Sequence, residues 1–153
     1  MSDLYETDIA LWAERQAGLL RRRAAGDLVN EADIDWLYVA EEIEDVARRE
    51  RDQIKSRLVV LCVQLLKWQF QPKRRSRSWR GSIVEARKRV AGLTEDSPSL
   101  RPYPDHALAK AYEDGRPQAE AETGMTLPTE CPWSIEQVLD ADFWPEAGQR
   151  DAA

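Results

Sequence analysis

Apolar residues recur at helical spacing along the start of the chain. Thr7 is suited to cap a first helix, Asp8 would lie in its positive first turn, and Gly26 follows a basic run at 21–23 and ends it. The apolar positions of this segment are Ile9, Leu11, Trp12, Leu19 and Leu20. Because they are spaced as on one side of a helix, the pattern predicts an amphipathic first helix.

A much longer helix is predicted from about residue 33 to about residue 71, spanning roughly 55 Å at 1.5 Å per residue. After Ile54 it is apolar on nearly every side, which is typical of a helix surrounded by others. Before Ile54 it has one apolar stripe, and a break between 47 and 54 is left open. Steps of three and four residues trace a seam through Leu37, Ala40, Glu44, Ala47, Arg51, Ile54, Leu58, Leu61, Leu65 and Trp68.

Two charged residues, Glu44 and Arg51, interrupt this seam. Buried charges persist only when they are paired and hydrogen-bonded. We therefore expect either a specific partner there, with Arg15, Arg21 and Arg22 as candidates, or a solvated groove.

Helix signals continue after Pro72, which ends the long helix. Ser76 or Ser78 is expected to cap a third helix that reaches Leu93, followed by a loop over 94–99. A fourth helix is expected from Pro104 or Asp105, with a kink or stop at Gly115 and Pro117 and an end at Gly124. Ser134 and Gln137 have capping-box spacing, which predicts a short helix near 135–139.

These elements predict an all-α fold: an antiparallel bundle of about four main helices with a long central helix and a short C-terminal helix or strap. Trp133, Phe143 and Trp144 of the strap are expected to cover the core. We expect a single domain over 1–153, ordered over roughly 3–146, with a flexible tail at 147–153.

Composition agrees with a folded protein of 153 residues, because 42% are hydrophobic and six are Trp. The first residues lack the pattern of a secretory signal, and the longest apolar run, 58–66, is far shorter than the ~20 residues of a membrane helix. Cys62 and Cys131 lie far apart and have no partner at metal-ligand spacing. We expect free cysteines, a cytoplasmic location and no membrane association.

Charge is strongly segregated within a net charge of −6. Residues 57–93 contain ten basic residues and one acidic residue, whereas residues 94–153 contain four basic and thirteen acidic ones. The aromatic residues Trp68, Phe70 and Trp79 lie among these cations, and a basic patch with aromatic side chains is typical of a nucleic-acid-binding surface. Two observations weigh against this interpretation: the tryptophans fall on the apolar seams of their helices, and the acidic C-terminal third is able to neutralise the cations. The candidate binding residues of this basic turn are Lys67, Lys73, Arg74, Arg75, Arg77 and Arg80.

An acidic cluster on the long helix is the other polar feature. Glu41, Glu44 and Asp45 share a helix face, but a di-metal bundle site needs Glu-x-x-His pairs, and His106, the chain's one histidine, has no Glu three residues before it. Ion pairs along the helix explain the cluster better, so we predict no metal, no cofactor and no catalytic residue. The predicted polar seam network consists of Glu41, Glu44, Asp45, Arg48 and Arg51.

Several short segments are spread in order over nearly the whole chain: Tyr5, Asp8, Trp12 and Gln16; 40–45; 65–69; 75–79; 97–100; and Cys131 with Pro132. Together they resemble a bacterial family known as domain of unknown function 29. This resemblance implies an all-α fold, and the family's name records no activity. One departure is the stretch 115–117, where related chains tend to continue as a helix.

Three functions are consistent with these observations. The first is a helical interaction or assembly module, homo-oligomeric or with another protein partner. The alternative is a nucleic-acid-binding protein that uses the basic turn 67–80, and the second alternative is a metal-dependent hydrolase that uses Glu41, Glu44 and Asp45. The sequence has no Gly-rich phosphate loop, Cys-x-x-Cys or Gly-x-Ser-x-Gly motif, which weighs against an enzyme.

Overall fold

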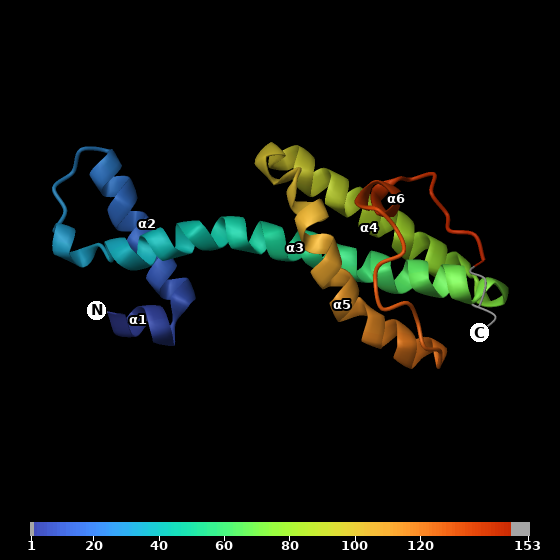
Figure 1. Cartoon of the computed structure of the whole chain (residues 1–153). Helices are drawn as coiled ribbons and strands as arrows, with labels where there is room; N and C mark the ends of the chain where they lie inside the picture. The colour runs from blue at the N-terminus through green and yellow to red at the C-terminus, as the bar shows by residue number, and fades with distance from the viewer. Residues whose placement is uncertain (1, 148–153) are drawn as a thin grey trace. The chain divides into compact units, whose positions relative to one another are not determined.

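Helices are the only regular secondary structure in a computed structural model of the chain, which describes residues 2–147 (Figure 1). The prediction of an all-α fold is confirmed. Most of the predicted flexible tail lies outside the described residues. The α-helices are α1 (Ser2–Thr7), α2 (Ile9–Ala24), α3 (Trp36–Phe70), α4 (Arg77–Asp96), α5 (Tyr103–Thr123) and α6 (Ile135–Leu139), and the short 3-10 helices are η1 (Glu31–Asp33), η2 (Pro72–Arg74) and η3 (Pro98–Leu100).

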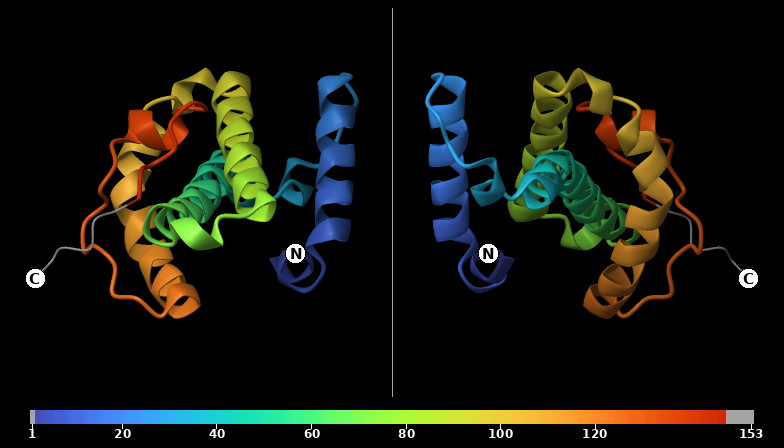
Figure 2. Two further views of the ribbon diagram at one scale, coloured as in Figure 1. Left: turned by 90° about the vertical axis from the view of Figure 1, so that its right-hand side faces the viewer. Right: turned by 90° about the vertical axis from the view of Figure 1, so that its left-hand side faces the viewer.

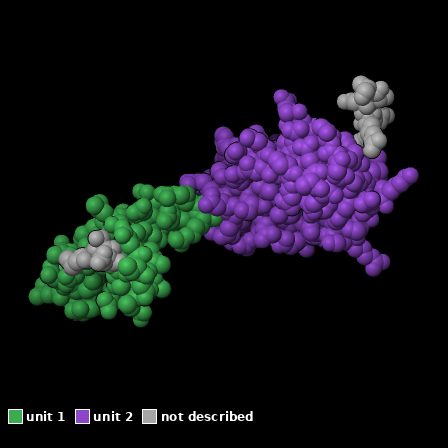
Figure 3. All heavy atoms as spheres, turned by 90° about the horizontal axis from the view of Figure 1, so that it is seen from below, with its two compact units in different colours: residues 1–49 green, residues 50–153 purple. Residues whose placement is uncertain are grey.

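The chain divides into two compact units, residues 1–49 and residues 50–153 (Figure 3). The boundary falls within α3, which contributes its first part to one unit and its second part to the other. The prediction of a single domain over 1–153 stays a prediction.

The first unit begins with a helix that the apolar pattern did not predict. Because α1 occupies residues up to Thr7, the expected cap at Thr7 is wrong, and Asp8 caps α2 instead by accepting a hydrogen bond from the Leu11 amide. Gly26 follows α2 with φ +88°, a left-handed backbone conformation that glycine adopts without steric cost.

Aromatic contacts and polar side chains hold this unit together. Tyr5 stacks on Tyr38 of α3 with ring centroids 4.1 Å apart and meets the Trp12 ring edge-on at 4.8 Å. The Trp12 Nε1 atom donates to Asp35 Oδ2 at 2.7 Å. Gln16 donates to the Asp33 carbonyl and accepts from the Asp35 amide, which fixes η1 and the start of α3 against α2. These contacts join α1 and α2 to η1 and to the start of α3.

The long helix α3 runs from Trp36 to Phe70 without interruption, so the break left open between 47 and 54 is absent. Its second part lies between α4 and α5 (Figure 2). The side chains of Ile54, Leu58, Leu61, Leu65 and Leu66 are fully buried there. Burying an aliphatic side chain contributes about 1.5–3 kcal/mol, so this stretch forms the centre of the core, as predicted.

The first part of the predicted seam is wrong, because its residues face solvent. Leu37 is 88% exposed, and Glu44 and Arg51 are exposed as well. Arg48 of the same helix, not an arginine of α2, pairs with Glu44 at 3.6 Å. The spacing of three and four residues is correct as a helical pattern, but these side chains are exposed, so no helix among residues 2–147 covers that side.

Helices α4 and α5 depart from prediction at their ends and middle. Ser76 caps α4, which continues through Asp96 where a loop was expected. In α5 the expected kink or stop at Gly115 and Pro117 is wrong, because the helix is continuous through both. Pro117 has no N–H to donate to the Glu113 carbonyl, and both residues are exposed, so water is able to reach this carbonyl. Gly115 is buried against α3.

The C-terminal strap closes the second unit as predicted. Ser134 and Gln137 form the capping box of α6. Trp133 is buried, while Phe143 and Trp144 are partly buried against the core. The Trp133 Nε1 atom donates to Gln69 Oε1 at 2.8 Å, which ties the strap to the end of α3.

Candidate functional site

The predicted basic turn is only partly available for binding. Lys67 is buried, with its Nζ 3.3 Å from Glu122 Oε1 and 4.6 Å from the centre of the Trp79 ring. Arg75 lies over the Trp68 ring and donates to the carbonyls of Trp68 and Pro145. Lys67 therefore joins α3 to α5, and Arg75 joins the end of α3 to the strap.

The remaining members of the basic turn are exposed. Arg80 lies over the Trp144 ring, 4.5 Å from its centre. Lys73, Arg74 and Arg77 form no ion pair with any described residue. Nucleic-acid binding through this turn stays a prediction, because three of its six cations have neither an ion pair nor a contact with an aromatic ring among the described residues and are able to meet a phosphate.

The strap adds a buried cation that sequence reasoning did not single out. Arg87 of α4 is 5% exposed; its Nε donates to the Val138 carbonyl at 2.8 Å and its Nη2 to the Phe143 carbonyl at 2.9 Å. The guanidinium also lies over the Trp144 ring at 5.3 Å, and burial lowers the pKa of Arg87. These contacts anchor both α6 and the chain that follows it.

The acidic cluster of α3 forms ion pairs along its own helix. Arg48 pairs with Asp45 at 2.7 Å and with Glu44 at 3.6 Å, and Arg49 pairs with Glu42 at 3.3 Å. Glu42 also accepts a hydrogen bond from Tyr5, which raises the tyrosine pKa to about 12. No grouping of three or more potential metal ligands occurs among residues 2–147. The hydrolase alternative at Glu41, Glu44 and Asp45 stays a prediction.

Two members of the predicted polar network differ from the rest. Glu41 and Arg51 are exposed, and neither forms an ion pair with another residue in the described part of the chain. They are ten residues apart, which places them about 80° apart around a helix with 3.6 residues per turn.

A neighbouring face of α3 is apolar and open, and sequence reasoning missed it as a site. At 100° per residue, its members occupy roughly a third of the helix circumference. Trp36 is 50% exposed, Ile43 67% and Val46 60%, and the two alanines are also exposed. We call this surface the apolar face of α3; it consists of Trp36, Val39, Ala40, Ile43, Val46 and Ala47.

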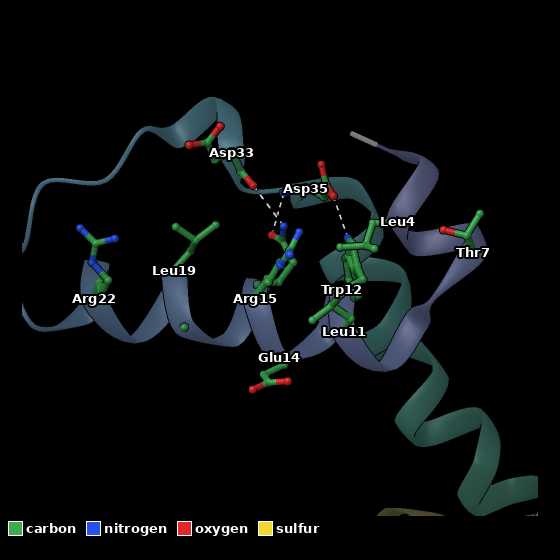
Figure 4. A pocket seen from close by; sticks show the side chains of 12 residues that line it. Leu4, Thr7, Leu11, Trp12, Glu14, Arg15, Leu19, Arg22, Asp33 and Asp35 are labelled. Atoms are coloured by element: carbon green, nitrogen blue, oxygen red, sulfur yellow. Dashed lines mark hydrogen bonds between the residues drawn. The ribbon is translucent and has the colours of Figure 1, made fainter.

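The first unit also contains a hollow of about 950 Å³ beside α2 (Figure 4). Leu4, Leu11 and Leu19 supply its apolar wall, and Arg15 and Arg22 add positive charge. Among the described residues of this unit, only two apolar side chains, Trp12 and Ile34, are buried. Residues 1–49 therefore leave much of their apolar surface uncovered.

Both cysteines lie in the second unit, where the fold brings them together. Cys62 is buried in α3, and Cys131 is half-buried in the irregular segment before α6. The Cys131 thiol and burial raise the pKa of Cys62, and the Cys62 thiol lowers the pKa of Cys131 to about 7. The Cys131 Sγ atom donates to the Trp133 carbonyl at 3.4 Å.

None of the described helices is long and apolar enough to cross a membrane.

Comparison with known proteins gives a single informative result. No curated protein and no solved structure matches the chain significantly. Residues 4–144 match the sequence profile of one family, which covers nearly all of the chain and agrees with the resemblance seen in its short motifs. The chain therefore belongs to the family described as "Domain of unknown function DUF29".

Proposed function

We propose that this protein is a helical assembly module in which two copies pair through the apolar face of α3. The observation that carries the proposal is the exposure of Trp36, Ile43 and Val46 on one continuous side of a helix. A contiguous apolar patch on a folded protein marks an interaction surface, since water solvates it poorly. We further propose a location in the bacterial cytoplasm, where thiols such as Cys62 and Cys131 stay reduced.

The spacing of this face supports a helix as its partner. Trp36, Ala40, Ile43 and Ala47 follow steps of four, three and four residues. This is the repeat by which paired helices interlock their side chains. The two alanines allow close approach, while Trp36 and Ile43 provide most of the apolar area.

Charged residues flank the face without interrupting it. Glu44 and Arg51 are seven residues apart, about 20° apart around the helix, and both are exposed beside the face. A second copy presents the same stripe of Trp36, Ile43 and Val46, so two copies bury apolar surface on both sides while these charges stay at the solvated rim.

Sedimentation equilibrium over a wide concentration range tests the proposal. We expect a dimer for the native chain and a monomer for the double variant Ile43→Glu, Val46→Glu, because four carboxylates would lie in the buried interface. Leu28→Glu is the matched control, since Leu28 is 93% exposed and lies outside α3; it should remain dimeric. A native chain that is monomeric at every concentration contradicts the proposal.

A further inference from the structure

We propose that the outer face of α4 binds a single-stranded nucleic acid, with cations on its phosphates and one unstacked base in a small hollow between α4 and the C-terminal strap. The residues involved lie within 72–141, in the second unit, so the inference does not rest on the proposed pairing through α3. We call this surface the basic face of α4; it consists of Arg77, Arg80, Gly81, Val84, Lys88 and Ala91.

The spacing of these six residues places them on one side of the helix. At 100° per residue they fall within about 100° of one another, away from the buried side chains of Ile83, Ala86 and Val90. All six are exposed. From Arg77 to Lys88 the face is about 16 Å long, so it is able to contact several successive phosphates of an extended strand.

The cations of this face have no carboxylate partner. Arg77 and Lys88 form no ion pair with another described residue, and neither do Lys73 and Arg74 of η2, which precede the helix. Arg80 contacts an aromatic ring of the strap but likewise has no ion pair within residues 2–147. Phosphates are groups that would neutralise this row of charges.

Acidic residues border the face without crossing it. Glu85 is the one acidic residue within 77–91; it lies about 80° around the helix from Arg77 and pairs with Arg57 of α3 at 3.4 Å. Glu95 lies in the last turn of α4, and Asp140 follows α6 on the side of the strap. A polyanion is therefore directed along the row of cations.

A small hollow opens beside Lys88, where α6 lies against α4 (Figure 1). Its volume is about 200 Å³, below the ~300–1,000 Å³ of pockets for drug-sized ligands, so its size suits a single ring system. Both α4 and the strap supply apolar side chains to its walls, as the two faces of a nucleobase require. The lining residues are Val84, Arg87, Lys88, Ala91, Leu139 and Ala141.

Arg87 adds a positive charge that is not balanced inside the protein. It is 5% exposed, it forms no ion pair with a described residue, and its Nη1 has no hydrogen-bond partner there. A buried charge without a counter-ion is costly. A strand whose base enters the hollow and whose phosphate meets Lys88 would offset part of this charge. Because a duplex keeps its bases stacked, the hollow favours a single strand.

A lipid surface is the other polyanion that these cations would attract, but the face lacks side chains that enter a bilayer. Val84, at 37%, is the only large hydrophobic residue of α4 that is exposed. Helices that lie in a membrane surface have bulky apolar residues along one side. The basic face of α4 therefore fits a nucleic acid better than a membrane.

Fluorescence anisotropy of the full chain with a labelled single strand of about 12 nucleotides tests the inference. If four or five phosphates are neutralised, the affinity should fall roughly 50- to 130-fold between 50 and 200 mM salt. An abasic strand of the same length has the phosphates without the bases. It should bind more weakly by about 5-fold or more, since no base occupies the hollow.

Variants separate the phosphate contacts from the base contact. Arg77→Gln and Lys88→Gln should each lower the affinity and reduce the slope of log affinity against log salt by about 0.7. Ala91→Leu keeps a good helix former but fills the hollow, so it should remove the difference between normal and abasic strands and leave the slope unchanged. The matched control is Arg101→Gln, because Arg101 is exposed after η3, beyond the other end of α4; it should change neither quantity.

Several results would overturn the proposal. They are the absence of binding to a single strand at low salt, equal binding of normal and abasic strands, a duplex bound as tightly as a single strand, and an equal loss of affinity from Arg101→Gln. Binding to phosphatidylserine vesicles without binding to the oligonucleotide would also overturn it and would assign the basic face of α4 to a lipid surface.

Discussion

At the scale of the residue, Gly115 shows how one position resolves a conflict between local and tertiary preference. It lies two residues before Pro117 in α5, and a glycine and a proline this close together usually indicate that a helix kinks or ends. A Cβ at this position would lie 3.2 Å from the Val59 carbonyl oxygen and 3.3 Å from Val63 Cγ2 of α3. The missing side chain allows the two helices to approach, and their packing keeps α5 continuous.

We predict that Gly115→Ala lowers the free energy of unfolding by about 1 kcal/mol or more, although alanine is the better helix former. The Val59 oxygen belongs to the backbone of α3 and does not move aside. Gly92→Ala in α4 is the control, since nothing lies within 4 Å of its added Cβ; it should stabilise by up to about 1 kcal/mol. Urea denaturation measures the free energy of unfolding of both variants. If both variants were equally stabilised, a Cβ at position 115 would not hinder the approach of α5 to α3.

At the scale of the element, the two parts of the continuous helix α3 differ in how much of their apolar surface is buried. Its second part is enclosed, with Ile54, Leu58 and Leu61 fully buried, whereas Ile43 and Val46 of its first part are exposed. Both parts have apolar residues at helical spacing. What separates them is whether other helices of the same chain cover the apolar side.

At the scale of the whole molecule, the C-terminal strap completes the second unit through polar contacts as well as aromatic ones. Arg87 serves as donor to carbonyls at Gln137, Val138 and Phe143. The Trp144 ring, which packs beside Trp68 at 4.8 Å, covers the guanidinium. A cation that appears in the sequence to belong to a charged patch is thus part of the interior.

We predict that Arg87→Met lowers the free energy of unfolding by about 2–4 kcal/mol, because it leaves buried carbonyls of the strap without donors. Arg89→Met is the control on the same helix; Arg89 is exposed and donates only to Gln53 Oε1 among the described residues, so the change should stay within about 0.5 kcal/mol. Thermal denaturation compares the two. Equal small effects would show that the aromatic contacts hold the strap without Arg87.

The sequence by itself determined the helical elements and the buried part of α3. Helix propensity, capping at Ser76 and Ser134, and the left-handed Gly124 are local properties, and each is found where its residues predict it. The capping of α2 by Asp8 and the continuity of α5 through Pro117 were not predicted, because each depends on a neighbour: α1 in one case and α3 in the other.

Only the tertiary structure decided which residues of the candidate sites are available. Lys67 and Arg75 of the basic turn contact Glu122, aromatic rings and the Pro145 carbonyl of the strap, while the apolar face of α3 is left open. Periodicity shows which residues share a side of a helix, but not what covers that side. Exposure and contacts between distant residues depend on how the chain packs, and spacing along the sequence does not contain that information.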